Sequence, residues 1–352
     1  MSEKIRENEA VRIHKHRNRK ANAILLGLGM VLVVLAVSSF LVGRYPISPD
    51  KVLGILANGV LPIDQFWTDQ EALIFFNVRL PRVVLAMLVG CCLSAAGAAY
   101  QGTFQNPLVS PDILGASQGA AFGAAVAILL GFASFGVSAL AFIMAIVTVM
   151  LVVAVAQAAR GNQVLTVVLA GVMVSSLLSA GVSITKLIAD PTDQLPAITY
   201  WLMGSLTGAK PTDVTLAAPP MIVGLVVLFV LRWRINILTM GDDEASTMGV
   251  NTKTLRLIII LAATLVTAAS VAVTGMIGWV GLVIPHLSRM LIGSDYRKLM
   301  PASMLMGASF LLLVDDVSRL ATTAEIPIGI LTAFIGAPFF LYLITREGRK
   351  RK

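Results

Sequence analysis

The chain has 352 residues, of which 57% are hydrophobic and only 13% carry a charged side chain, and its mean hydropathy is +0.85. Soluble globular domains contain about 45–50% apolar and about 25% charged residues. This composition excludes an ordinary soluble enzyme, a disordered chain and a soluble nucleic-acid-binding domain, although the formal net charge is +8. The sequence therefore indicates an all-α polytopic membrane protein.

Stretches without Asp, Glu, Lys or Arg predict ten membrane-spanning helices, since a span needs about 20 apolar residues. Two stretches are long enough for two helices each. Glycines divide 113–159 near positions 131–136, and they divide 257–288 into a full span and a shorter helix that ends near Ile292. The other six spans are predicted within 21–43, 83–111, 161–185, 214–231, 299–314 and 326–345.

The stretch 194–209 is short for a membrane span and has Pro196 near its start and Pro211 just beyond its end. We expect a short re-entrant or interfacial helix on the outer side, because irregular backbone at membrane depth needs protein or water around it. Small residues such as Gly90 and Gly97 recur in the predicted spans and favour close helix packing.

The basic residues predict the orientation in the membrane. With both termini cytoplasmic, 20 of the 27 Lys and Arg residues fall on the cytoplasmic side, in agreement with the positive-inside rule. This predicts a basic tail over 1–20, one ten-span domain over 21–346 and a second basic tail over 347–352. The net charge then reflects topology and contact with anionic lipid, and no nucleic acid is expected as a partner.

Catalytic and metal-binding motifs are missing from the sequence. It has no GxxxxGK[ST] phosphate loop, no HExxH and no GxSxG. Cys91 and Cys92 are adjacent in an apolar run and are expected to be small buried side chains. We therefore expect no enzyme activity, metal or cofactor in this chain. The first apolar run is too long for a cleavable signal peptide, so we expect it to persist as a span.

Four groups of motifs stand out from the apolar background. A proline suits a helix start, so Pro81 is expected near the beginning of the second span. A loop between two spans predicts a short amphipathic helix that Asp242 or Asp243 caps and Gly249 ends. The four groups are Arg79–Arg82, the turn over 100–115, the loop over 236–250, and Gly278–His286 with the later segments 315–319 and 325–329.

Together these motifs resemble the transmembrane permease family of ABC importers for iron–siderophore complexes, haem and cobalamin. The resemblance runs from about residue 24 to the end of the tenth span. Its most specific pieces are Arg-Leu-Pro-Arg at 79–82, Gln-Asn-Pro-Leu at 105–108 with Pro-Asp-Ile-Leu-Gly at 111–115, Gly-x-x-Gly-Leu-Val-x-Pro-His at 278–286, and Ile-Pro-Ile-Gly-Ile-Leu-Thr-Ala at 326–333.

The resemblance implies a set of partners: a second permease copy or a sibling chain, two cytoplasmic ATPase subunits that carry the ATP and magnesium, and an extracytoplasmic substrate-binding protein. Arg79, Arg82 and Arg319 match the positions at which acidic residues of the binding protein dock. Arginine suits this role because its planar fork pairs with a carboxylate through two hydrogen bonds.

The loop over 233–253 matches the family's coupling helices, which sit in a cleft of each ATPase. The residues expected there are Gly241, Asp242, Asp243, Glu244, Ala245, Met248 and Gly249, with the small ones allowing close approach to the partner. By the same resemblance, Ser175, Ser176, Ser179 and Ser183 are candidates to line the translocation path. Hydroxyls bonded back to their own helix are an equally good interpretation of these serines.

Two adjacent acids lie near the outer end of the ninth predicted span, where a carboxylate is costly and indicates function. Asp315 or Asp316 can pair with Arg319 at helical spacing and present it outward. The second acid has no assigned partner in the sequence.

The sequence thus predicts the permease of a binding-protein-dependent importer in the bacterial inner membrane, with a ferric siderophore as its cargo. Haem and cobalamin are the alternative cargoes within the family. A gradient-driven secondary transporter is the alternative from another class, but it would need ionisable residues at the middle of the spans. The cargo, the choice between homodimer and heterodimer, and the role of the loop over 44–78 are left open.

Overall fold

The computed structural model describes residues 2–43, 45–58, 64–159 and 163–350, and these ranges contain helices and no strand. Arg44, Arg160, Arg351 and Lys352, which entered the count of basic residues, lie outside the described residues. In the described chain seven helices are long and apolar enough to cross a membrane, and three shorter apolar helices accompany them. The protein is therefore a helical, multi-pass membrane protein.

Each of the ten predicted spans contains a helix. The number of membrane crossings and the side on which the termini lie remain predictions. In chain order the elements are α1 (Ser2–Leu41), α2 (Pro49–Asn58), α3 (Asp69–Ile74), the π-helical turn η1 (Phe75–Arg79), α4 (Leu80–Thr103), the 3-10 turn η2 (Pro111–Leu114), α5 (Ala116–Leu129), α6 (Ser134–Ala158), α7 (Gln163–Ile188), α8 (Gln194–Leu202), α9 (Pro211–Leu238), α10 (Asp242–Thr247), α11 (Thr252–Thr274), α12 (Val280–Ile292), α13 (Tyr296–Leu320) and α14 (Ile328–Lys350).

The predicted breaks within the long apolar stretches are present. The chain turns between α5 and α6 at residues 130–133, and it is non-helical over 275–279 between α11 and α12. The non-helical segment after α8 packs against this second break, where the Ser205 amide donates to the Thr274 carbonyl at 2.6 Å. The Gly329 amide donates in turn to the Gly204 carbonyl at 3.3 Å. These bonds satisfy backbone groups that lipid could not.

Pro81 lies in the first turn of α4, as expected, but α4 is not the first helical segment here. Helical turns begin twelve residues before Pro81, where the Thr68 hydroxyl accepts from the Glu71 amide and the Glu71 carboxylate accepts from the Thr68 amide. Helix α3 then runs through η1 into α4. Proline has no amide hydrogen and crowds the carbonyl four residues before it, so a wider turn before Pro81 lets the helix continue.

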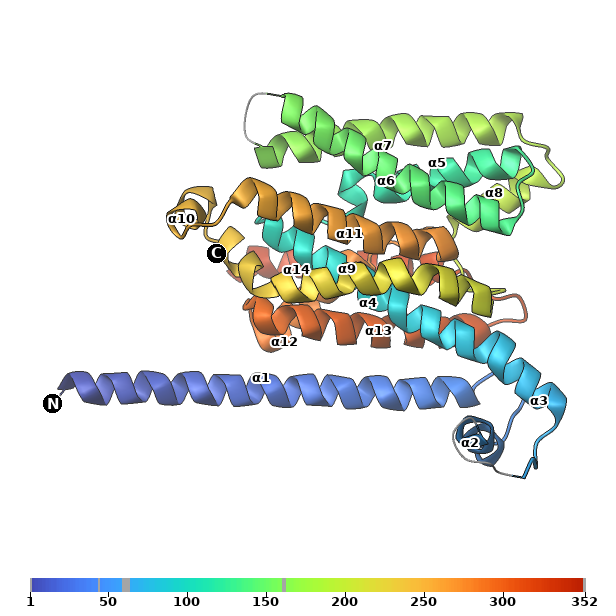
Figure 1. The fold of residues 1–352 in the computed structure, drawn as a ribbon, viewed down its shortest axis with the longest axis horizontal. Helices are drawn as coiled ribbons and strands as arrows, with labels where there is room; N and C mark the ends of the chain where they lie inside the picture. The colour runs from blue at the N-terminus through green and yellow to red at the C-terminus, as the bar shows by residue number, and fades with distance from the viewer. Residues whose placement is uncertain (1, 44, 59–63, 160–162, 351–352) are drawn as a thin grey trace.

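The helices form one bundle with two distinct ends (Figure 1). Helix α10 lies at one end, which we call the α10 end, together with the start of α11 and the end of α9. Helices α2 and α3 lie at the opposite end, which we call the α3 end. At the centre, α4 packs against α9, α11, α12 and α13.

Glycines on α4 permit this central packing. A Cβ atom on Gly97 would lie 1.8 Å from the carbonyl oxygen of Gly281 on α12, and one on Gly90 would lie 2.2 Å from that of Gly307 on α13. Backbone therefore meets backbone at both crossings, as expected for small residues between membrane helices. The helices could not cross at this distance with any side chain on these residues.

The substitution Gly97→Ala should lower the stability of the folded chain by about 1–3 kcal/mol or more, because backbone atoms must move to make room. The control is Gly27→Ala on α1, where a Cβ would meet nothing within 4 Å. Thermal unfolding in detergent should separate the two variants. Equal melting temperatures would contradict the close crossing of α4 and α12.

Candidate functional site

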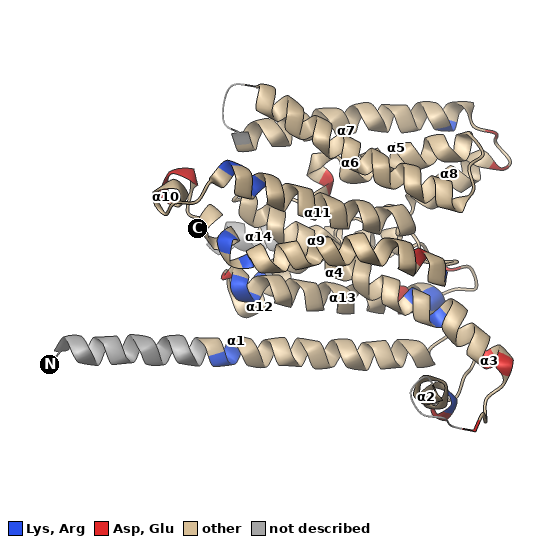
Figure 2. Ribbon diagram, viewed as in Figure 1, with Lys and Arg blue, Asp and Glu red and all other residues tan. Residues whose placement is uncertain are grey.

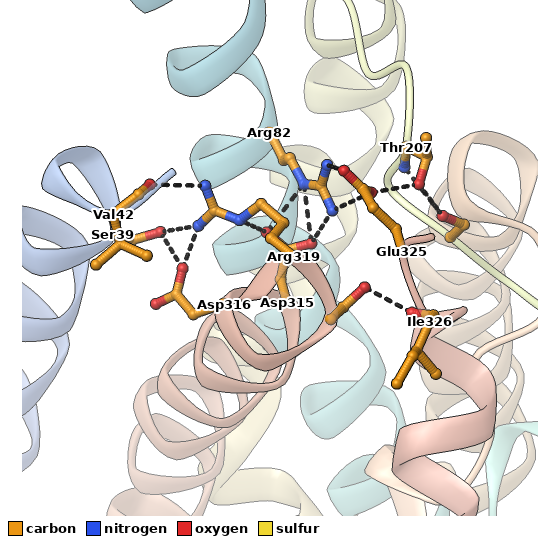
Figure 3. A network of polar contacts seen from close by, with 11 residues as sticks. Ser39, Val42, Arg82, Thr207, Asp315, Asp316, Arg319, Glu325 and Ile326 are labelled. Carbon is orange, nitrogen blue, oxygen red and sulfur yellow. Dashed lines mark hydrogen bonds and ion pairs between the residues drawn. The ribbon is translucent and has the colours of Figure 1, made fainter. Parts of the chain in front are cut away.

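A network of buried charges lies at the α3 end of the bundle (Figure 3). It joins α4 through Arg82, α13 through Asp315, Asp316 and Arg319, and the segment before α14 through Glu325. These elements are far apart in the sequence. Their charged side chains meet because each needs an opposite charge in a region of low dielectric.

Asp315 is the centre of this network and is completely buried. The Arg82 guanidinium donates to it in a fork, with Nε–Oδ2 and Nη2–Oδ1 distances of 3.1 Å and 2.9 Å. On the other side, Arg319 Nε lies 3.3 Å from Asp315 Oδ2. The Arg82 fork also contacts Glu325, at 3.1 Å and 2.9 Å.

Asp316 has a partner as well, which answers the question left by the two adjacent acids. It forms an ion pair with Arg319 and accepts a hydrogen bond from the Ser39 hydroxyl of α1 at 2.7 Å. Arg319 Nη1 also donates to the Val42 carbonyl at 3.3 Å. Arg319 was expected to pair with one of the two acids; it pairs with both, and the contacts extend to α1.

The three arginines predicted for docking are all buried. The exposed fractions of Arg79, Arg82 and Arg319 are 4%, 5% and 7%. Arg79 donates to the Phe40 and Tyr45 carbonyls, so it closes the turn after α1 and does not share partners with Arg82. The expectation that Arg319 is presented outward is wrong, because its guanidinium is surrounded by its own chain. Direct pairing with a carboxylate of another protein would require these contacts to exchange.

Glu325 and Ser39 were not singled out as members of a site from the sequence. Glu325 stood inside a quoted motif, and an acid beside apolar residues was the only signal it gave. Besides Arg82, Glu325 accepts a hydrogen bond from Thr207 at 2.6 Å, so it links the segment after α8 to the network. Ser39 gave no signal at all, because serines are common in membrane helices.

The described parts of the loop over 44–78, residues 45–58 and 64–78, pack together at the α3 end. Ile47, Ile55, Trp67 and Phe75 belong to one buried apolar cluster between α2, α3 and η1. The Lys51 ammonium lies 2.8 Å from the Glu71 carboxylate, and this hydrogen bond raises the pKa of Lys51 above its ordinary value.

At the α10 end, the predicted amphipathic helix is present but short. It begins at Asp242 and its N-cap is Gly241, with φ of 118°, so the expected aspartate cap is wrong. Gly249 ends it as expected, in the left-handed region with φ of 76°. The amide groups of Gly249 and Val250 then donate to the Ser246 and Ala245 carbonyls.

Ala245 is completely buried and faces its own chain, where α10 packs on α9 and α11. Its small size therefore serves packing within the chain, in contrast to the expected contact with a partner. Asp243, Glu244 and Met248 are exposed, and Met248 retains 60% of its accessible surface. The outer surface of α10 and its C-cap residue therefore carries both charged side chains and an apolar one.

Two long-range contacts fix the position of α10. Arg256 on α11 donates to Asp242, with an Nη2–Oδ1 distance of 2.8 Å. The Gln105 side chain, in the turn after α4, donates to the Leu238 carbonyl at 2.8 Å. Gln105 itself has a φ of 51°, in the left-handed region. The Gln-Asn-Pro-Leu motif thus contacts the chain directly before α10.

The four candidate serines on α7 do not form one group. Ser175 Oγ is buried, without a hydrogen-bond partner in the described chain, beside Gly115. Ser176, Ser179 and Ser183 are exposed, and two of them donate back to carbonyls of their own helix, Ser176 to Val172 and Ser183 to Ser179. The alternative interpretation, in which the hydroxyls bond back to their own helix, therefore holds for two of the four serines.

Substitution of Asp315 by Ala should be strongly destabilising, by about 3–5 kcal/mol, because two guanidinium groups lose their buried counter-charge. Asp193→Ala, at an exposed acid at the same end of the bundle, is the control and should cost far less. The readout is the fraction of chain that remains folded in detergent against temperature. A melting temperature equal to that of the control would contradict a central role for Asp315.

Comparison with known proteins gives a consistent result. A family model described as the FecCD transport family matches residues 31–346. The molybdate import system permease protein of Haemophilus influenzae is 40% identical over 93% of this chain and 96% of that protein. A probable iron chelatin transport system permease protein of Helicobacter pylori is 39% identical, over 91% of this chain and 97% of that one.

A solved structure described as an inward-facing conformation of a metal-chelate type ABC transporter superposes with a TM-score of 0.83. It is 39% identical, and the match covers 92% of this chain and 99% of that chain. The relatives are named as permeases, which are transport subunits. With the motifs in the predicted order, the chain belongs to the FecCD transport family of ABC importer permeases.

Proposed function

We propose that this chain is the transmembrane subunit of a binding-protein-dependent ABC importer, driven by ATP hydrolysis on a partner ATPase. The observation that carries the proposal is the geometry of α10. It is a short helix at one end of the bundle, held by α11 and by the turn after α4, with an exposed outer face. A partner that moves α10 would move these spans with it.

The α10 end is then the cytoplasmic end, in a bacterial inner membrane. The described cations support this orientation, because Lys and Arg gather at the ends of α9, α11 and α12 near α10 (Figure 2). In this orientation the ten predicted spans place both termini in the cytoplasm. The charge network and α2 lie on the outer side.

A second permease copy or a sibling chain would cover the exposed apolar surface of α7 and α14. Four large apolar side chains on these helices each retain at least 66% of their accessible surface: Met173, Leu177 and Leu187 on α7 and Phe334 on α14. Because lipid can also cover these side chains, their exposure supports a partner chain only in combination with membership of the permease family. Ser176, Ser179 and Ser183 lie on exposed parts of α7 and remain candidates for the translocation path at such an interface.

For the cargo we propose an iron complex, with a ferric siderophore as the first choice and haem or cobalamin as alternatives. The relative named for iron chelatin supports the first choice. Because one relative is named for molybdate import, a small oxyanion joins haem and cobalamin as an alternative cargo. The binding protein is expected to select the cargo.

The test is uptake by a strain that lacks the gene, offered labelled ferric siderophores, haem, cobalamin and molybdate in turn. The wild-type gene and Met248→Leu should restore import of one cargo, while Met248→Glu should not, because a charge disturbs the apolar contact of α10 with an ATPase. All three proteins should fold equally well, since Met248 is exposed. Full uptake by Met248→Glu, or purification without any ATPase subunit, would overturn the assignment.

For docking, we propose that Arg79, Arg82 and Arg319 receive acidic residues of the binding protein on the outer face when their present contacts exchange. Arg79→Glu should then weaken association with the binding protein, more strongly at low salt. Arg79→Gln separates the loss of the arginine contacts from charge reversal, and Lys210→Glu reverses an exposed cation at the same end. If affinity is unchanged in the folded fraction of Arg79→Glu, this residue serves only the fold.

A further inference from the structure

A groove between α6, α7 and α11 at the α10 end has the features of a binding site that transport does not require. Its volume is about 420 Å³. Lys253, Thr254 and Arg256 from the start of α11 form part of its lining, and no acidic residue lines it among the described residues. The remaining lining residues are Val153, Ala156, Gln157, Ala159, Val167, Leu257 and Ile260.

The polarity of the groove changes along the helices. The basic and polar lining residues lie in the first turns of α11 and the last turn of α6, at the end of the bundle. One turn further into the bundle than Gln157 and Arg256, the lining is apolar at Val153 and Ile260. A phospholipid shows the same change from charged to apolar, from its headgroup to its acyl chains. The headgroup would contact the basic lining and the acyl chains the apolar lining.

Arg256 is the most deeply buried charged residue of this lining. It is 3% exposed, and its Nε hydrogen has no acceptor in the described part of the chain. Its other donors contact only Asp242, whose side chain is about half exposed. A buried N–H of a charged group without an acceptor is costly. The Nε atom has almost no accessible surface, so a phosphate oxygen in the groove would reach it only after the side chains around Arg256 move.

We propose that this groove binds the headgroup of an anionic phospholipid from the adjacent leaflet, with Lys253 and Arg256 contacting the phosphate. Basic pockets between membrane helices at this level are typical of such sites. The site does not depend on the transport cargo. Arg256 also donates to Asp242, the first residue of α10. The lipid phosphate and Asp242 would therefore share one guanidinium, and bound lipid would change how firmly α10 is held.

Native mass spectrometry can measure this binding on the full-length chain, purified with the subunits that it retains. The probes are phosphatidylglycerol and phosphatidylcholine with identical acyl chains, and inorganic phosphate serves as a competitor. We expect selective retention of phosphatidylglycerol, reduced about fivefold by Lys253→Gln. Asp242→Asn should increase it, because Arg256 loses its internal counter-charge.

The matched control is Lys298→Gln, which removes a half-buried cation from the same end of the bundle outside the groove. Lys253 is exposed, and Lys298 loses only its hydrogen bond to Asn22, so neither substitution is expected to unfold the chain. Equal retention of the two lipids, or equal losses in Lys253→Gln and Lys298→Gln, would overturn the proposal. Displacement of the lipid by an equal concentration of inorganic phosphate would assign the groove to free phosphate and overturn the lipid site.

Discussion

The buried carboxylate of Asp315, with a guanidinium on each side, is the interaction on which the α3 end of the bundle depends. A charge in a low-dielectric region is tolerated only when it is paired and hydrogen bonded. Arg82 and Arg319 satisfy Asp315, and Glu325, Asp316 and Ser39 then satisfy the arginines. One requirement for charge balance thus connects α1, α4, α13 and the segment before α14.

This network changes the meaning of the predicted docking residues. With every side chain ionised, its two arginines face three carboxylates, so the cluster itself offers no excess positive charge. The arginines order the outer surface first, and any contact with a binding protein is formed through exchange of partners. Docking of this kind would change contacts of all four connected elements at once, whereas docking on an unpaired surface arginine would change no contact within the chain.

Local features of the chain could be predicted from its sequence. The helices, the breaks near Gly131 and Gly275, and the end of α10 at Gly249 follow from apolar length and glycine position, which are local properties. The pairing of Arg319 with an acid three or four residues before it follows from helical spacing. For the same reason the family motifs were sufficient to name the family.

Contacts between distant segments could not be predicted in the same way. Arg82 and Asp315 are separated by 233 positions, and nothing in either neighbourhood indicates the other. The inward orientation of Ala245 depends on how Arg256 holds α10, and a single sequence does not contain that information. The helical turns that precede Pro81 depend on the capping box of Thr68 with Glu71 and on a widened turn, and the proline motif indicates neither of them.

The most direct test of the central claim is a double-mutant cycle between Arg82 and Asp315, using Arg82→Ala, Asp315→Ala and the double variant. The free energy of unfolding of each protein, measured in the same detergent, gives the coupling energy of the pair. Charges in direct contact within one network should couple by about 1–3 kcal/mol, so the double variant should be more stable than the sum of the single losses implies. A coupling energy near zero would mean that the two residues act independently, and it would contradict the account.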